Sequence, residues 1–198
     1  MLLQVKNQKE RPKSSTFFYL GQAYELLREY KKCLLNYKKC LQIDQNHFGA
    51  SIYLANLLAN LAEGQRAVKY FKHALKIDPN SINANFGMAK ALQQYSEDKD
   101  APIPHFLLVI EKDTENFKAH TQLGILYLDR EEFEKSTHHL KKALSINKQF
   151  PLALLSMGNL LFETNHPEDA IRFHKHALKY NPKELQALIG LGNAYYDM

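Results

Sequence analysis

The chain has 198 residues, of which 45% are hydrophobic and 24% charged, a composition typical of an ordinary soluble globular protein. An apolar stretch at residues 48–62 contains Ser51, Asn56 and Asn60 and is shorter than the roughly 20 apolar residues of a membrane span. The first residues lack the apolar core of a signal peptide. A net charge of +5 is too small for the broad basic field that nucleic-acid binding needs. We therefore expect no membrane span, no nucleic-acid partner and a cytoplasmic location, with the nucleus as the alternative.

The first predicted segment is residues 1–13. It carries Lys6, Lys9, Arg11 and Lys13 against Glu10, so more than half of the net charge lies here. We expect a basic N-terminal tail or the end of a preceding helix.

Two cysteines, Cys33 and Cys40, follow seven residues apart on one predicted helix. Their Cα atoms would then be about 10.5 Å apart, which exceeds the roughly 7 Å limit for a disulfide. We expect both to be unpaired with each other, as in a reducing compartment.

A repeat of 34 residues organises residues 14–198. The sequence LQID at 41–44 returns as LKID at 75–78, and ALSIN at 143–147 returns as ALKYN at 177–181, each after 34 residues. The predicted repeats are 14–47, 48–81, 82–116, 117–150 and 151–184, followed by a partial repeat at 185–198. The eighth position of every repeat is small: Gly21, Ala55, Ala89, Gly124, Gly158 and Gly192.

Each repeat has the pattern of two helices. Its small and apolar residues recur at positions 4, 7, 8 and 11 and again at 20, 24 and 27, which is the spacing of one helix face. A short turn between the two groups makes the helices antiparallel neighbours. One such hairpin cannot bury both of its faces, so the repeats must stack. The sequence therefore predicts an all-α fold, an α-solenoid of stacked antiparallel helix pairs.

The third repeat departs from this pattern. It has an extra residue and two prolines, with Pro102 where neighbouring repeats have Ala or Ser. Proline fits only the first turn of a helix, so we expect the second helix to start late, with Asp100 as its N-cap, and to run to about Lys112. We expect the highest mobility at residues 96–101.

The repeat pattern resembles the tetratricopeptide repeat family, whose 34-residue unit has small residues at positions 8, 20 and 27. The resemblance covers residues 14–198, and Pro79 and Pro182 match the proline that the family often has near position 32. It implies a right-handed superhelix and a role in binding proteins. The related 35-residue RNA-binding helical repeats fit less well, because four of the five complete repeats have 34 residues.

In the family, first helices line a concave groove, and positions 2, 5, 9, 12 and 13 commonly face it. Position 5 here is apolar in five of six repeats, and position 9 is an amide in four of six. Amides can pair with the backbone of any extended peptide, and an apolar row would hold its side chains. The alternative is that position 5 packs between repeats and the amides bond only to water. The predicted peptide-binding groove comprises Phe18, Gln22, Ile52, Asn56, Phe86, Lys90, Leu155, Asn159, Ile189 and Asn193.

The sequence contains no catalytic motif, and its nine histidines lack the spacing of a zinc site. We expect no enzymatic activity, no cofactor and no metal. His174 occupies position 24, where the other repeats have Tyr, Phe or Leu, and we expect a half-buried, hydrogen-bonded core histidine.

The leading interpretation is a non-enzymatic protein–protein interaction scaffold that binds a polypeptide segment in its concave groove. The alternatives are the recognition arm of a larger enzyme, such as an O-linked N-acetylglucosamine transferase, and a structural subunit of a large multiprotein assembly. Binding of chaperone C-termini is not expected, because no repeat has the lysine at position 5 that such family members use. The partial repeat leaves Leu188, Leu191 and Tyr195 without a second helix, so we expect self-association or a longer array through this C-terminal helix.

Overall fold

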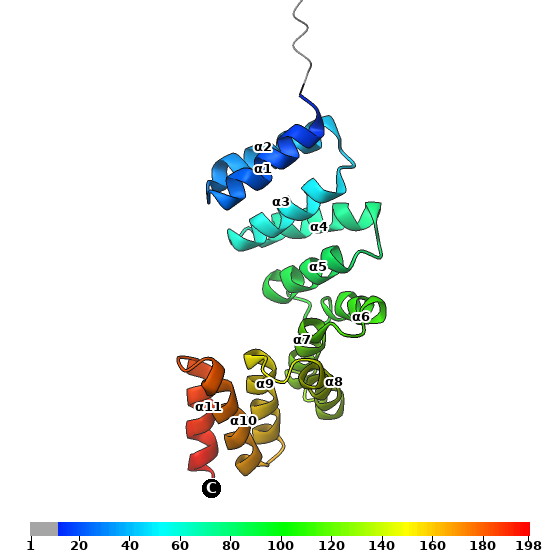
Figure 1. The fold of residues 1–198 in the computed structure, drawn as a ribbon. Coiled ribbons are helices and arrows are strands. Elements are labelled where there is room, and N and C mark those ends of the chain that lie inside the picture. Colours follow the sequence, from blue (N-terminus) through cyan, green and yellow to red (C-terminus); the bar gives the residue numbers. More distant parts are fainter. Residues whose placement is uncertain (1–11) are drawn as a thin grey trace, which may run out of the picture. The chain divides into compact units, whose positions relative to one another are not determined.

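The computed structural model describes residues 12–198, and within that range every regular element is an α-helix (Figure 1). Within each of the two compact parts of the chain described below, consecutive helices pack against each other, which confirms the predicted all-α solenoid of helix pairs. Residues 1–11 of the predicted basic tail lie outside the described residues. The helices are α1 (Ser14–Leu26), α2 (Tyr30–Ile43), α3 (Phe48–Asn60), α4 (Gly64–Ile77), α5 (Ile82–Tyr95), α6 (Ile103–Lys112), α7 (Phe117–Leu128), α8 (Phe133–Ile146), α9 (Pro151–Glu163), α10 (Pro167–Tyr180) and α11 (Leu185–Tyr196).

These helices form two compact units. The first ends at Tyr95 and contains α1–α5, and the second, Ser96–Met198, contains α6–α11. The boundary lies at the irregular third repeat. This repeat therefore contributes its first helix, α5, to one unit and its second helix, α6, to the other.

A large side chain at position 24 of each second helix is completely buried. Glycines make room for several of these side chains. A Cβ at Gly21 would lie 2.4 Å from the Tyr37 ring, and one at Gly87, in the following repeat, would lie 2.4 Å from the Phe71 ring. Tyr37 is thus packed against a glycine of its own repeat, and Phe71 against a glycine of the next. The five buried side chains are Tyr37, Phe71, Phe106, Leu140 and His174.

The turns inside four of the repeats share one backbone conformation. Arg28, Ala62, Glu131 and Asn165, all at position 15, have φ between 57° and 62°. The following N–H donates to a carbonyl five residues earlier, as from Glu63 to Leu58 at 2.9 Å. This closure is typical of helix C-termini that end in a left-handed residue. It explains why the connection between paired helices is short in these repeats.

The third repeat has a longer connection instead. Its second helix, α6, begins at Ile103 with Pro102 in the N-cap position, so the prediction of Asp100 as N-cap was wrong by two residues. The helix starts late and ends at Lys112, as predicted, and its 10 residues make it about one turn shorter than the 14-residue helices α2, α4, α8 and α10. The Ile103 amide instead donates to the Asp100 carbonyl, which forms a turn just before the helix.

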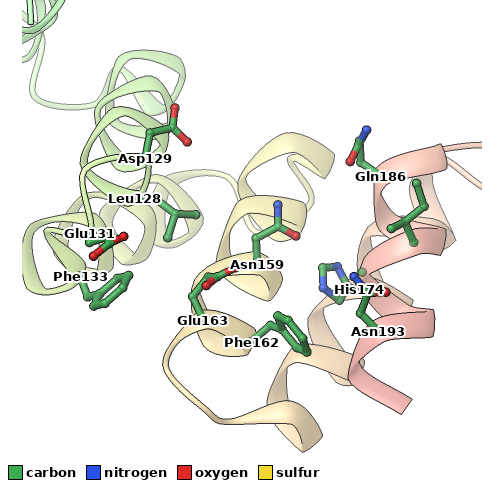
Figure 2. A pocket seen from close by; sticks show the side chains of 12 residues that line it. Leu128, Asp129, Glu131, Phe133, Asn159, Phe162, Glu163, His174, Gln186 and Asn193 are labelled. Atoms are coloured by element: carbon green, nitrogen blue, oxygen red, sulfur yellow. The ribbon is translucent and has the colours of Figure 1, made fainter. Parts of the chain in front are cut away.

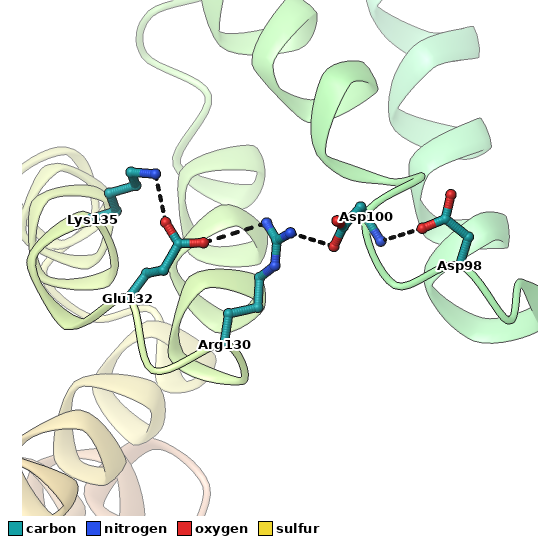
Figure 3. A network of polar contacts seen from close by, with 5 residues as sticks. All are labelled: Asp98, Asp100, Arg130, Glu132 and Lys135. Atoms are coloured by element: carbon teal, nitrogen blue, oxygen red, sulfur yellow. Dashed lines mark hydrogen bonds and ion pairs between the residues drawn. The ribbon is translucent and has the colours of Figure 1, made fainter.

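An ionic network holds the end of this connection (Figure 3). The Asp100 carboxylate pairs with Arg130, which also lies 3.5 Å from Glu132, and Glu132 pairs in turn with Lys135. The Asp98 carboxylate accepts a hydrogen bond from the Asp100 amide. The segment is exposed, and its high mobility stays a prediction.

The two cysteines are free and buried, as predicted. The thiol of Cys33 donates to the Gly21 carbonyl at 3.1 Å. Burial raises the pKa of each thiol to about 11, so neither carries the thiolate that reacts with disulfides or metals.

Candidate functional site

The predicted apolar row at position 5 is mostly packed into the fold. Ile52 and Leu155 are each 8% exposed, and Phe18 and Phe86 are half-buried. Ile189, on α11, is 47% exposed. The row is therefore not a continuous exposed strip, and only its last member offers a large apolar surface.

The amides at position 9 are open to solvent and have no protein partner. Asn56 and Asn193 are exposed, and Gln22 and Asn159 are half-buried. Among the hydrogen bonds of residues 12–198, none involves the side chain of these four residues. Lys90, at the same position of α5, is exposed as well.

Asparagines with a structural role in the same chain behave differently. The Asn36 amide donates to the Lys32 carbonyl at 2.8 Å, and the Asn85 amide donates to the Pro79 carbonyl at 2.9 Å. The position 9 amides make no such bond, so the described fold leaves their polar groups available to solvent or a ligand.

The second unit contains a pocket of about 430 Å³ that takes in the last two of these amides (Figure 2). We call it the C-terminal pocket. Asn159, Ile189 and Asn193 belong to the predicted groove, and the structure brings them together here from α9 and α11. The pocket is lined by Leu128, Asp129, Glu131, Phe133, Asn159, Phe162, Glu163, His174, Gln186, Ile189, Gly190 and Asn193.

His174 lines this pocket from α10. Its side chain is 0% exposed, and neither ring nitrogen has a hydrogen-bond partner among the described residues. The expectation of a half-buried, hydrogen-bonded histidine was wrong, because glycines on both sides let the ring sink fully into the fold. A Cβ at Gly158 would lie 2.7 Å from the ring, and one at Gly190 would lie 2.6 Å from it. Burial lowers the pKa of His174, so the ring is neutral near pH 7.

Three carboxylates surround the same pocket. Asp129 and Glu131 follow α7, Glu163 ends α9, and all three are exposed. None of the three takes part in an ion pair within residues 12–198. Partial desolvation raises the pKa of Asp129, and the charge of Lys99 opposes this shift. The pocket rim is thus negatively charged and uncompensated by any contacting cation.

A second histidine cluster lies between α7 and α8. The Nδ1 atoms of His120 and His139 are 3.0 Å apart, so one ring donates and the other accepts. The His139 ring also stacks on Tyr127 at a centroid distance of 5.6 Å. Burial, together with the charges of His120 and His138, lowers the pKa of His139 to about 4. Burial likewise lowers the pKa of His120. The cluster is a neutral part of the core, and residues 12–198 contain no group of three or more side chains that could hold a metal ion.

Sequence reasoning missed the acidic residues and the pocket itself. Asp129 and Glu163 are at position 13 of their repeats, and Gln186 is at position 2. Positions 2 and 13 are among those that commonly face the groove in the tetratricopeptide repeat family. These repeat positions could therefore have indicated Asp129, Glu163 and Gln186 from the sequence. Glu131 and His174 lie outside the set, and only the packing of α8 and α10 brings them to the pocket.

A family model described as tetratricopeptide repeat matches residues 15–47, 54–81 and 117–150. The chain contains tetratricopeptide repeats. Solved structures share the fold of this repeat protein. The MamA protein has a TM-score of 0.76 at 22% identity, covering 86% of this chain and 93% of its own. YrrB, described as a TPR protein with an unusual peptide-binding site, has a TM-score of 0.74 at 16% identity, covering 87% and 89%.

A curated relative matches part of the repeat protein. This relative is the protein O-mannosyl-transferase Tmtc3 of Drosophila melanogaster, to which the chain is 32% identical over 89 residues. The alignment covers 45% of this chain and 10% of that protein, so the chain spans about a tenth of its relative's length. Across residues 12–198, we find no helix with the length and hydropathy needed to cross a bilayer.

Proposed function

We propose that this repeat protein is an interaction scaffold that binds an extended polypeptide segment along its first helices. The observation that carries the proposal is the set of position 9 amides, which recur on α1, α3, α9 and α11 and have no partner in the described fold. An amide has both donors and an acceptor, so it can satisfy the N–H and C=O of a peptide backbone together. Structural amides such as Asn36 instead bond to their own helix.

Two further observations support the proposal. The C-terminal pocket is partly apolar, with Phe133, Phe162 and Ile189 beside Asn159 and Asn193. A peptide would thus find both backbone partners and side-chain contacts in one place. YrrB, described as a TPR protein with an unusual peptide-binding site, has a similar fold, which supports the proposal.

The test uses peptides selected from a random display library on the purified protein, with affinity measured by fluorescence anisotropy. The combined variant Asn56→Ala, Asn159→Ala and Asn193→Ala should bind them at least about tenfold more weakly, since each amide–backbone bond contributes about 1 kcal/mol. The matched control removes three exposed amides in the inter-repeat turns: Asn46→Ala, Asn80→Ala and Gln149→Ala. Equal affinity of both triple variants would count against the amides, and failure to select any peptide would count against the function.

The other interpretations receive less support. The curated relative is named as a mannosyl-transferase, but the match covers 10% of it, so an arm attached to an enzyme is a weaker second candidate. A subunit role in a large assembly, the absence of enzymatic activity and the cytoplasmic location stay predictions.

A further inference from the structure

We propose that the C-terminal pocket binds the side chain of an arginine or lysine in an extended peptide. This deepens the proposed function and rests on it, because it assumes that a polypeptide occupies the first helices of the second unit. The partner is therefore a polypeptide with a basic residue at the position that reaches this pocket.

Charge is the first argument. The pocket lining contains Asp129, Glu131 and Glu163 but no lysine or arginine. Some carboxylates of the same unit are paired, such as Asp100 with Arg130 and Asp169 with Arg172 (Figure 3 shows the former). The three at the pocket form no ion pair within residues 12–198, although Lys99 influences Asp129. A cation that enters the pocket would meet uncompensated negative charge.

Helix ends add to this potential. Asp129 is the C-cap of α7, and Glu163 is the last residue of α9. The C-terminal end of a helix carries partial negative charge, so acidic residues there are unfavourable and basic ones are stabilising. Neither helix has a basic residue in its last turn. The chain thus places acids where they weaken its own helices, which is expected where binding rather than stability decides the residue.

The buried histidine is the second, independent observation. His174 is 0% exposed, lies at the pocket wall and has two ring nitrogens without a partner in the described chain (Figure 2). A buried polar group of this kind is unstable unless something completes it. Burial lowers the pKa of His174 and keeps the ring neutral, so one nitrogen retains a lone pair that can accept a hydrogen bond. Both nitrogens are covered by the pocket wall, so an ammonium or guanidinium group would reach this lone pair only when the wall at Gly190 shifts on binding.

The remaining lining suits a long cationic side chain rather than a bare ion. Among residues 12–198, no group of three or more His, Cys, Asp or Glu side chains is placed to hold a metal ion, and this includes the three pocket carboxylates. Phe162, Phe133 and Ile189 would contact the aliphatic stem, and the charged head would lie among the spaced carboxylates. Asn159 and Asn193 would pair with the backbone on either side of that residue.

The experiment compares four fluorescein-labelled peptides of alanine, serine and leucine that differ only in a central arginine, citrulline, lysine or norleucine. Citrulline and norleucine keep the shape of the two basic side chains without their charge. Binding to the full chain is measured by fluorescence anisotropy at physiological salt. We expect the arginine and lysine peptides to bind at least tenfold more tightly than their neutral counterparts.

Variants locate the effect. The triple change Asp129→Asn, Glu131→Gln and Glu163→Gln should reduce the preference for the charged peptides to less than threefold. The control triple, Glu97→Gln, Glu134→Gln and Glu168→Gln, removes the same charge from exposed carboxylates of the same unit outside the pocket and should keep the preference. Thermal melts followed by circular dichroism check that both remain folded.

The outcomes separate the two proposals. If charged and neutral peptides bind equally well, and binding is lost in the double variant Asn159→Ala and Asn193→Ala, the pocket does not recognise a basic side chain. The scaffold function would then still stand. If the variant Asp129→Asn, Glu131→Gln and Glu163→Gln still prefers charged over neutral peptides, the charge is recognised elsewhere on the protein. This result would also overturn the inference. Displacement of the arginine peptide by equimolar spermidine would show a site for free polyamines instead. No binding of any of the four peptides would overturn the inference, whereas the scaffold function is tested separately by the library selection.

Discussion

Replacing His174 by phenylalanine should stabilise the protein. At the wild-type position, a buried imidazole has one N–H donor and one acceptor nitrogen that no described residue satisfies. Each unsatisfied buried group costs about 1–3 kcal/mol, whereas an apolar group of the same shape carries no such cost. We expect His174→Phe to raise the free energy of unfolding by about 2 kcal/mol at pH 7.

The fold has room for the larger ring. In the first two repeats, six-membered rings occupy the equivalent slot: Tyr37 lies 2.4 Å from the place of a Cβ on Gly21, and Phe71 lies 2.4 Å from that on Gly87. His174 contacts one glycine of its own repeat and one of the next, Gly158 and Gly190, so its slot has at least as much glycine around it. A phenylalanine there restores what the other repeats already do, so overpacking is not expected to cancel the gain.

The gain should grow as the pH falls. Burial lowers the pKa of His174 in the folded state, so the unfolded chain, with a histidine pKa near 6.5, takes up the proton first. Wild type therefore loses stability as the pH falls below about 6.5, and the phenylalanine variant does not lose that contribution. Urea denaturation at several pH values measures both effects.

His176→Phe, two residues away and exposed, is the matched control and should change stability by less than about 0.5 kcal/mol. A His174→Phe variant that is less stable than wild type, or whose difference from wild type is the same at pH 8 and pH 5, would refute the reasoning.

Three further predictions follow from the same packing. The folded pKa of His139 is about 4, so the unfolded chain takes up a proton there before the folded one. His139 alone should therefore lower the free energy of unfolding by about 2 kcal/mol between pH 7 and pH 5. In urea titrations, the free energy of unfolding of His139→Phe should depend less on pH than that of wild type, while the exposed control His176→Gln should behave as wild type. Gly124→Ala should lower the free energy of unfolding by about 1 kcal/mol, because the new Cβ would lie 2.6 Å from Leu140. Gly192→Ala should raise it by about 1 kcal/mol, because nothing lies within 4 Å of the new Cβ and alanine favours the helix. A change of the same sign at both glycines would contradict the packing. The exposed apolar residues of α11 predict self-association, so sedimentation velocity should show a weight that rises with concentration, and a strict monomer at every concentration would exclude it.

Local chemistry explains why much of the fold was predictable. Small residues at position 8 and large ones at position 24 recur with the period of the repeat. Three such pairs meet within one hairpin: Gly21 with Tyr37, Gly124 with Leu140, and Gly158 with His174. Pro79 and Pro182 likewise follow the ends of α4 and α10 directly. Such features depend on neighbours in sequence, so the sequence displays them. The N-cap of α6 was misplaced because a turn closed by the Asp100 carbonyl, invisible in the residue pattern, delays the helix to Ile103.

The candidate site was predictable only in part for the same reason. Asn159, Ile189 and Asn193 could be named from their repeat positions, but the depth of burial could not. Whether a position 5 side chain faces solvent depends on how closely the next repeat packs, and this left Ile52 buried and Ile189 exposed.

The sequence alone determined the all-α repeat architecture, the helix pairs and the free cysteines, because each follows from spacing along one or two helices. Only the tertiary structure decided that His174 lies fully buried without a partner and that the carboxylates of α7 and α9 border the same pocket. Burial and charge sum over several helices that are distant in sequence, and no periodic pattern records that sum.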